Sequence, residues 1–353
     1  MDPLTHALSG ALLARVASPT RPTAHPPHHA LPLRWQIAAG FIAAAFPDID
    51  LVLRLIDTLT YLNWHQGPTH SLVLLPVWAG LLAWSFSGLS RGRFGWQLFY
   101  QPACLGLTIH IAGDLITSYG LMLFAPFSTE RYSLPLVFVI DPWFSLIIAA
   151  GLIASWRYPR RRIAAIAALL VLCGYVIFLF MLHQQAAAIA HRYAESQTIS
   201  YSQIDVLPQP LSPFHWKIII RNRETYHIAD IDLSISTEKR QTDTWLLSKM
   251  TAAYRPVAEN NWKIQQQFGS DPTRAPLLRE AWLANAFTPF RAFAQFPVLE
   301  DSVDVQGQKF CAWFYDLRFK FPELPPSFRY GVCRENDQTD WQMARQRGVF
   351  YID

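Results

Sequence analysis

Histidine and aspartate residues recur within the most apolar part of this chain. An ionisable side chain in a bilayer costs roughly 2.5 kcal/mol or more on insertion scales, and it usually faces a partner or a functional cavity. Imidazole and carboxylate groups together are ligands that suit zinc, manganese and iron. We therefore expect a metal site, and the candidate ligands are His6, Asp48, Asp50, His65, His70, His110 and Asp114.

The spacing of two pairs favours shared ligation. His110 and Asp114 are four residues apart, so on a helix they share a face, with about 5–6 Å between Cβ atoms. They could hold one ion, the aspartate could orient the histidine, or the pair could only steady a helix bundle. Asp48 and Asp50 are two apart, and Pro47 could bend the helix end so that both point inward. Aspartates that only cap a helix end are also common.

The remaining candidates lie on a turn and near the start of the chain. His65 and His70 flank Gly67-Pro68, which predicts a compact turn. Two imidazoles on one tight turn can reach a shared ion. His6 taken alone is more typical of an interfacial histidine, and only its expected depth recommends it. The whole set permits one or two divalent transition-metal ions, with zinc as the first expectation.

Composition indicates a membrane protein with a soluble part. The chain has 353 residues and 13 Trp, and it is 51% hydrophobic and 16% charged, whereas soluble domains carry about 25% charged residues. Up to about residue 183, apolar runs alternate with short polar loops. Beyond it, charged and polar residues alternate with aromatic residues, as is typical of a soluble domain. We predict an α-helical polytopic membrane domain over residues 1–188, followed by an α+β or mostly-β domain over residues 189–353.

The apolar runs predict five to six membrane spans, since a span needs roughly 20 largely apolar residues. The candidates are residues 35–53, 71–88, 99–124, 143–156 and 163–183, with a shorter stretch at 3–16. If arginine-rich loops are cytoplasmic, nine arginines lie inside and only Arg54 and Arg131 outside. This orientation places the second domain outside the cytoplasm and the candidate ligands in the outer half of the bilayer. His25, His28 and His29 then fall in a Pro-rich cytoplasmic loop, which we interpret as a solvated linker.

Several motifs, in order, resemble one known family. They are the opening Met1–His6, Phe46–Asp50, His65–Ser71, and His110 to Asp114 followed by Thr117–Gly120, with Pro126-Phe127-Ser128 and Ile140-Asp141-Pro142 further on. These motifs are similar to those of the bacterial YdjM-like, LexA-regulated inner-membrane metal-dependent hydrolases. The resemblance is strong over the first half and scattered in the second.

The resemblance implies a location, a ligand set and a reaction class. It implies the bacterial inner membrane, with His6, Asp48, His65, His70, His110 and Asp114 as metal ligands. It adds Asp141 as a further ligand or as a base. Gln66 stands where the family motif usually has arginine. The family is regarded as hydrolytic through its distant likeness to zinc phospholipases C and related nucleases.

The leading hypothesis is therefore a membrane-embedded metal-dependent hydrolase. Its substrate would be a phosphoester or ester of an amphiphilic, lipid-like molecule, with membrane lipids around it. The metal would activate water, and Asp114 or Asp141 would take the proton. Because no basic face is present, we expect no nucleic-acid partner. The sequence predicts no particular protein partner.

Two other functions use the same ligands. A metal-ion or proton-coupled transporter would also carry intramembrane His and Asp groups, although internal repeats and polar groups at the inner span ends are lacking. A receptor or scaffold would hold a structural metal in a closed coordination sphere.

The second domain shows no catalytic constellation in sequence. Strands are predicted at residues 216–220, 231–235 and 312–319, and helical spacing runs over 276–293 with a break at Pro289. His215 and His227 have no evident partners. Cys311 and Cys333 could form a disulfide outside the cytoplasm or remain free thiols in a packed core.

Overall fold

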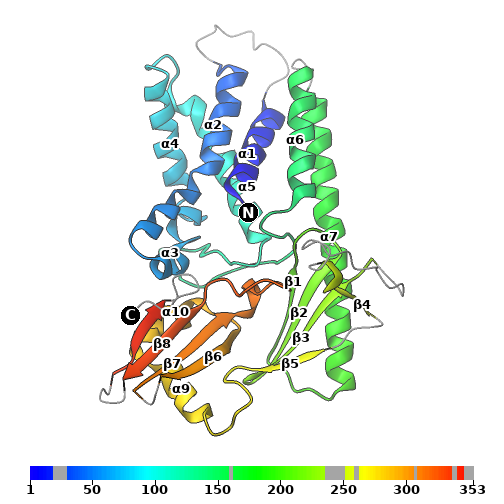
Figure 1. The fold of residues 1–353 in the computed structure, drawn as a ribbon. Coiled ribbons are helices and arrows are strands. Elements are labelled where there is room, and N and C mark those ends of the chain that lie inside the picture. Colours follow the sequence, from blue (N-terminus) through cyan, green and yellow to red (C-terminus); the bar gives the residue numbers. More distant parts are fainter. Residues whose placement is uncertain are drawn as a thin grey trace. The chain divides into compact units, whose positions relative to one another are not determined.

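The computed structural model describes residues 1–18, 30–158, 162–234, 251–257, 262–305, 308–335 and 340–345. The chain divides into two compact units, Met1–Met181 and Leu182–Asp353. The first is helical and the second is rich in β-structure (Figure 1), which confirms the predicted order of fold classes. The boundary predicted after residue 188 falls inside a long helix, and the His25–His29 cluster lies outside the described residues.

The helical unit alternates long helices with short, tight ones. Its elements are α1 (Pro3–Ala17), α2 (Leu33–Ala45), η1 (Pro47–Leu55), α3 (Thr58–Trp64), η2 (Pro68–His70), α4 (Leu75–Leu89), α5 (Trp96–Leu115), α6 (Pro142–Arg157) and α7 (Ile163–Ser196), the last of which continues into the second unit. The 3₁₀ helices η1 and η2 follow proline-containing breaks, where an α-helical hydrogen bond is lost.

The expected five to six spans are not confirmed. Among the described residues, only α7 is by itself long and apolar enough to cross a membrane. Two bent pairs, α2 with η1 and Thr58–His70 with α4, would raise the number to three if each pair is one span. Helix α5 ends at Leu115 rather than continuing to residue 124, and it carries Gln97, Gln101, His110 and Asp114. These polar residues lower its hydropathy, so it does not have the composition of a simple span.

Helices α1, α2 and α5 approach each other through glycines. A Cβ atom added at Gly40 would lie 2.6 Å from the carbonyl oxygen of Gly10, and one added at Gly106 would lie 2.6 Å from the carbonyl oxygen of Gly40. Real side chains do not approach backbone so closely, and small residues are what allow helices to pack this tightly in membranes. The glycines therefore set the separation of the three helices.

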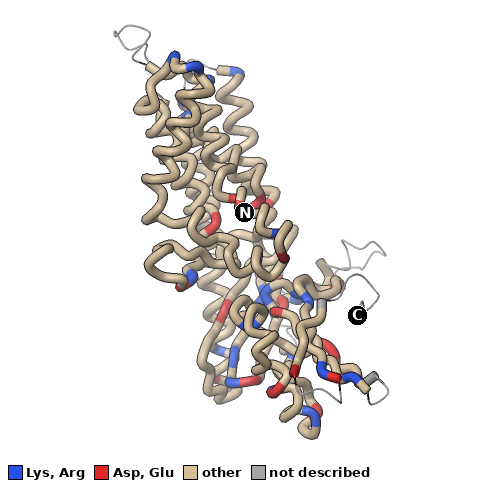
Figure 2. Tube along the Cα trace, turned by 90° about the vertical axis from the view of Figure 1, so that its left-hand side faces the viewer, with Lys and Arg blue, Asp and Glu red and all other residues tan. Residues whose placement is uncertain are grey.

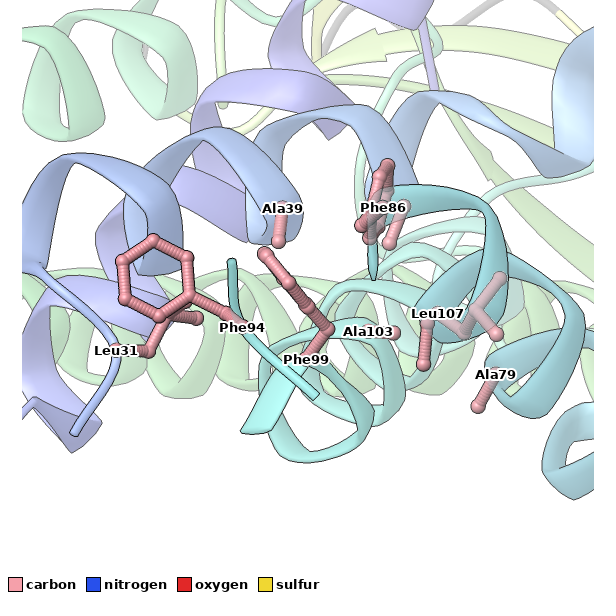
Figure 3. Packing of buried hydrophobic residues seen from close by; sticks show 10 residues of the cluster. Leu31, Ala39, Ala79, Phe86, Phe94, Phe99, Ala103 and Leu107 are labelled. Carbon is pink, nitrogen blue, oxygen red and sulfur yellow. The ribbon is translucent and has the colours of Figure 1, made fainter. Parts of the chain in front are cut away.

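An apolar cluster fills the space between α2, α4 and α5 (Figure 3). Its buried residues alternate alanines with phenylalanines, including Ala39, Ala79, Phe86, Phe99 and Ala103. Large rings opposite small side chains fill the interior at high density. This packing fixes α5, the helix on which His110 and Asp114 lie.

The second unit contains two sheets. The first is β1 (Gln203–Pro208), β2 (His215–Asn222), β3 (Thr225–Asp232) and β4 (Arg255–Pro256), with β5 (Lys263–Gln266) paired to β3; the second is β6 (Pro297–Val305), β7 (Lys309–Asp316), β8 (Tyr330–Glu335) and β9 (Gln342–Arg345). All pairs are antiparallel except β3 with β4. Helices α9 (Ala275–Leu283) and α10 (Thr288–Phe293), with η4 (Asn285–Phe287) between them, precede β6, and η5 (Leu317–Phe319) follows β7.

Several local predictions for this unit agree with the structure. The strand predicted at 216–220 lies in β2, and the strand at 312–319 lies in β7 and η5. The helical stretch 276–293 is divided into α9 and α10, but the break lies at Ala284 and η4, and Pro289 stands in the first turn of α10 rather than at the break. The strand predicted at 231–235 was placed too late, because β3 ends at Asp232. Cys311 and Cys333 face each other across β7 and β8 and form a disulfide.

The two histidines of this unit that had no evident partners do have them. His215 Nε2 lies 3.5 Å from Asp232 Oδ2, and Tyr193 Oη lies 3.2 Å from His227 Nδ1. Burial alone would raise the pKa of Asp232, but hydrogen bonds from His215 and Ser234 hold it at about 2. These contacts are internal polar links of the β-rich unit.

The glycine contacts predict a site-dependent response to added methyl groups. Gly106→Ala would push α5 away from α2 and should destabilise the protein by about 1–3 kcal/mol, as overpacking does. Gly80→Ala on α4 is the matched control, since a Cβ there meets nothing within 4 Å. The measurement is the midpoint of thermal unfolding in detergent. Equal midpoints for the two variants would contradict this account of the packing.

Candidate metal centre

The C-terminal half of α5 supplies two of the clustered side chains. His110 and Asp114 are one turn apart and both are buried, with 3.2 Å between His110 Nε2 and Asp114 Oδ2. The four-residue spacing thus places both on one helix face, as the sequence predicts. The helix ends one residue after Asp114, where Thr117 Oγ1 donates to the Asp114 carbonyl oxygen.

The two short helices supply the other two side chains. His70, from η2, places its Nε2 atom 3.3 Å from Asp114 Oδ2. Asp48, from η1, places Oδ1 at 3.9 Å from Nε2 of both His70 and His110. One ligand atom from each of these four residues lies within 4.8 Å of every other. Segments far apart in the chain thus meet at one point.

Each of the four residues has an orphaned polar atom. Among the described residues, Asp48 Oδ2, His70 Nε2, His110 Nε2 and Asp114 Oδ2 are buried and have no hydrogen-bond partner. A buried polar atom without a partner costs about 1–3 kcal/mol. Atoms around a tetrahedral zinc ion are about 3.3 Å apart, because Zn–N and Zn–O bonds are about 2.0–2.2 Å. Two imidazole nitrogens and two carboxylates at 3.2–3.9 Å therefore fit a divalent transition metal.

The bonding of His110 favours a ligating nitrogen. Its Nδ1 atom lies 2.6 Å from the carbonyl oxygen of Ala44 on α2. A carbonyl can only accept, so Nδ1 carries the proton and Nε2 presents its lone pair to the cluster. Such outer hydrogen bonds orient metal-bound histidines. The close glycine contact between α2 and α5 is what brings the carbonyl within reach.

His6 lies beside the cluster but is not among its four residues. Its ring stacks on that of His110, with 3.7 Å between centroids, and its Nε2 donates to Asp114 Oδ1 at 2.9 Å. The α-amino group of Met1 also pairs with Asp114 Oδ1. Both contacts leave Asp114 Oδ2 facing the cluster. The geometry therefore places His6 as a partner of a ligand candidate.

Asp50 and His65 form a separate pair next to the cluster. His65 Nδ1 donates to Asp50 Oδ1 at 2.8 Å, and the other oxygen, Oδ2, accepts from the Gln66 amide and the Thr69 hydroxyl. Both carboxylate oxygens of Asp50 are thus occupied. The structure brings neither residue into the four-membered group, although both were expected to be ligands.

Asp141, the other candidate base, is a helix cap. Its Oδ1 accepts from the backbone amides of Trp143 and Phe144 at the start of α6, and its Oδ2 accepts from the Tyr175 hydroxyl at 2.9 Å. An aspartate before a proline at a helix start is a typical N-cap. With both oxygens engaged there, Asp141 is not placed to accept a proton at the cluster.

Two groups that contribute to the site were not predicted from the sequence. The contact with the Ala44 carbonyl oxygen has no sequence motif that predicts it, since the backbone of any residue at that position would supply the oxygen. Of the hydroxyls of Thr69 and Ser71, one was expected to cap the helix that follows, but Thr69 bonds both His70 and Asp50. Ser71 Oγ accepts from the amides of Val73 and Leu74 just before α4, whose N-cap residue, Leu74, makes no side-chain hydrogen bond.

These features define a membrane protein with a His/Asp cluster that can bind a metal ion. Residues 1–186 match the YdjM inner membrane protein family. Because the match covers more than half of the chain, the chain belongs to this family. It is also 22% identical to the uncharacterized protein YfhP of Bacillus subtilis (strain 168) over 229 residues, which are 65% of this chain and 67% of that protein. No solved structure matches the chain.

The cluster predicts a defined metal stoichiometry. Purified protein in detergent should hold about one transition-metal ion, because the four groups converge on a single position. His70→Ala and His110→Ala should each lose it, because each removes an Nε2 ligand. His191→Ala, at an exposed histidine outside the cluster, should keep it. Elemental analysis measures the metal content. Undiminished metal in both cluster variants would contradict the proposed metal site.

Proposed function

We propose that this protein is a membrane-embedded metal-dependent hydrolase acting on a phosphoester or ester of an amphiphilic, lipid-like substrate. The observation that carries the proposal is the set of four orphaned atoms from Asp48, His70, His110 and Asp114. A bound divalent metal, zinc foremost, would supply Lewis-acid chemistry, polarising the ester oxygen and activating water.

The roles of the carboxylates follow from their contacts. Asp114 has one oxygen bonded to His6 and Met1 and the other facing the cluster, so neither is spare. Asp48 has an orphaned Oδ2 besides the Oδ1 that faces the histidines. We therefore assign the acceptance of a proton from water to Asp48, in place of Asp114 or Asp141. His70, His110 and Asp114 would then hold the metal and leave its fourth position open to water.

The exposure of the cluster indicates the side from which a substrate approaches. The side chain of Asp48 is 14% exposed, whereas those of His70, His110 and Asp114 are at most 1% exposed. On η1, which carries Asp48, the apolar residues Ile49 and Leu55 are 59% and 85% exposed. Apolar side chains at the open edge of the centre favour a substrate with a hydrocarbon part.

The proposed setting is the bacterial inner membrane, with several spans and the β-rich unit outside the cytoplasm. Basic residues gather at one end of the helical unit, while acidic residues lie nearer its middle (Figure 2). This asymmetry supports a cytoplasmic basic end. Helices α1, α5 and α6 would join α7 and the two bent pairs as membrane-embedded elements, giving the predicted five to six.

Transport of a metal ion or proton is the second candidate, favoured by the deep burial of His70 and His110. Burial without an aqueous path also suits a structural metal. The exposed edge at Asp48 favours hydrolysis over both, because a reacting group needs an open approach.

The orientation predicts the redox state of the second unit in cells. If this unit lies outside the cytoplasm, Cys311 and Cys333 should be fully disulfide-bonded there, since that compartment is oxidising. Alkylation of whole-cell extracts with a mass tag, with and without prior reduction, counts the free thiols. Cys104 and Cys173 are free and serve as the internal control. Four alkylated thiols without reduction would contradict the orientation.

The hydrolase proposal predicts turnover by the metal-loaded protein. It should cleave at least one of p-nitrophenyl phosphate, a p-nitrophenyl acyl ester and phosphatidylcholine in mixed micelles, with the lipid preferred. Asp48→Asn should lower kcat by about 10²–10⁴-fold, the usual contribution of a proton acceptor. No cleavage of any of the three, together with metal uptake into proteoliposomes, would favour transport instead.

A further inference from the structure

Thr69 lies between a metal-ligand candidate and a carboxylate. Its Oγ1 atom is 2.9 Å from His70 Nδ1 and 3.3 Å from Asp50 Oδ2. A threonine hydroxyl has one hydrogen to donate and lone pairs with which to accept. The direction of the first hydrogen bond therefore depends on where that single hydrogen goes.

Asp50 decides the direction. An ionised carboxylate only accepts hydrogen bonds, and Asp50 already collects donors from His65 and from the Gln66 amide. The Thr69 hydroxyl is the third donor to this carboxylate. Once its hydrogen points to Asp50, Thr69 can only accept from His70. The proton of the neutral His70 ring must then lie on Nδ1.

The same polarity holds at the second histidine of the cluster. His110 donates from Nδ1 to the Ala44 carbonyl, which also can only accept. Both rings thus keep the proton on the outer nitrogen, and both Nε2 atoms remain orphaned and aimed at the cluster. In the opposite tautomer, His70 would carry a hydrogen on Nε2, between itself and Asp114 Oδ2. That hydrogen would have to leave before a metal could bind.

We propose that Thr69 and Asp50 are positioning residues that fix the Nδ1–H tautomer of His70 and so prepare it to bind a metal ion. The inference rests on the metal centre proposed above. It gives Asp50 a role other than ligation, and it gives the Asp48-Ile49-Asp50 motif two distinct functions: Asp48 faces the cluster, while Asp50 orients the histidine opposite it.

The test compares Thr69→Val, which keeps the branched shape and removes the hydroxyl, with Thr69→Ser, which restores the hydroxyl. Loss of an outer hydrogen bond of this kind typically costs 10- to 100-fold in metal affinity. We expect that loss for Thr69→Val and wild-type affinity for Thr69→Ser, measured by Zn²⁺ titration of the full-length protein in detergent. Thr108→Val, at an exposed threonine on the same helix as His110, controls for the substitution itself and should bind as wild type.

A second measurement needs no metal. In ¹⁵N-histidine-labelled, metal-free protein, the NMR shifts of His70 should show Nδ1 protonated in the wild type and in Thr69→Ser, and a mixture of tautomers in Thr69→Val. Should Thr69→Val not fold, Thr69→Ala removes the hydroxyl without adding a methyl group. Wild-type affinity and an unchanged tautomer in whichever variant folds would overturn the proposal.

A thermodynamic cycle tests the pairing with Asp50. Asp50→Asn can donate to Thr69, which would turn the hydroxyl hydrogen toward His70. Its loss of affinity and that of Thr69→Val should not add in the double variant, since both act through one hydrogen bond. Additive losses of affinity would overturn the proposal that Asp50 acts on His70 through Thr69. His110→Ala distinguishes failure of the proposed metal centre from failure of the proposed role of Thr69. If this variant binds Zn²⁺ as the wild type does, the metal centre itself is wrong, whatever Thr69 does.

Discussion

The fold of the helical unit is constrained by four polar side chains that meet inside an apolar bundle. Each carries one buried atom without a hydrogen-bond partner among the described residues, and such atoms cost about 1–3 kcal/mol apiece. Two of them belong to carboxylates and two to imidazoles, so a cation can satisfy all four at once. Metal binding would then contribute to folding as well as to chemistry, because the unsatisfied state is the costly one.

The rest of the bundle holds these four side chains together despite the free-energy cost of their unpaired polar atoms. Contacts through Gly10, Gly40 and Gly106 bring the backbones of α1, α2 and α5 together, and the close approach allows the Ala44 carbonyl to reach His110. On the other side, Ser71 donates to the Ala125 carbonyl and ties the η2 turn to the loop that follows α5. His70 and His110 are each held at the outer nitrogen, His70 by the Thr69 hydroxyl and His110 by the Ala44 carbonyl.

The sequence predicts the cluster well where one helix carries it. His110 and Asp114 are adjacent because helical geometry alone brings residues four apart together. The meeting of Asp48 with His70 depends on two 3₁₀ helices whose bends no periodicity reports. His6, Asp50 and His65 were expected at the same depth as the cluster, and the structure places all three beside it. A shared depth does not separate a ligand from a residue that orients one.

Two expectations that the structure does not confirm have equally local causes. Asp141 precedes a proline and an apolar run, which is also the signature of a helix N-cap, and its contacts are those of a cap. The predicted five to six spans are not confirmed, because the hydrophobic runs were treated as straight helices. In the structure, proline and polar residues break α2 from η1 and η2 from α4, and the functional groups lie at those breaks.

That coincidence of breaks and ligands separates the candidate functions. A structural metal needs only a closed sphere, which four side chains from uninterrupted helices could supply. Here the break after α2 turns Asp48 toward the histidines and leaves it the most exposed of the four, beside the exposed apolar residues of η1. A carboxylate that is partly exposed while the other three side chains are buried is the group that an external molecule would reach first. Under the proposed hydrolase function, the bent elements would be the part of the fold that admits a substrate.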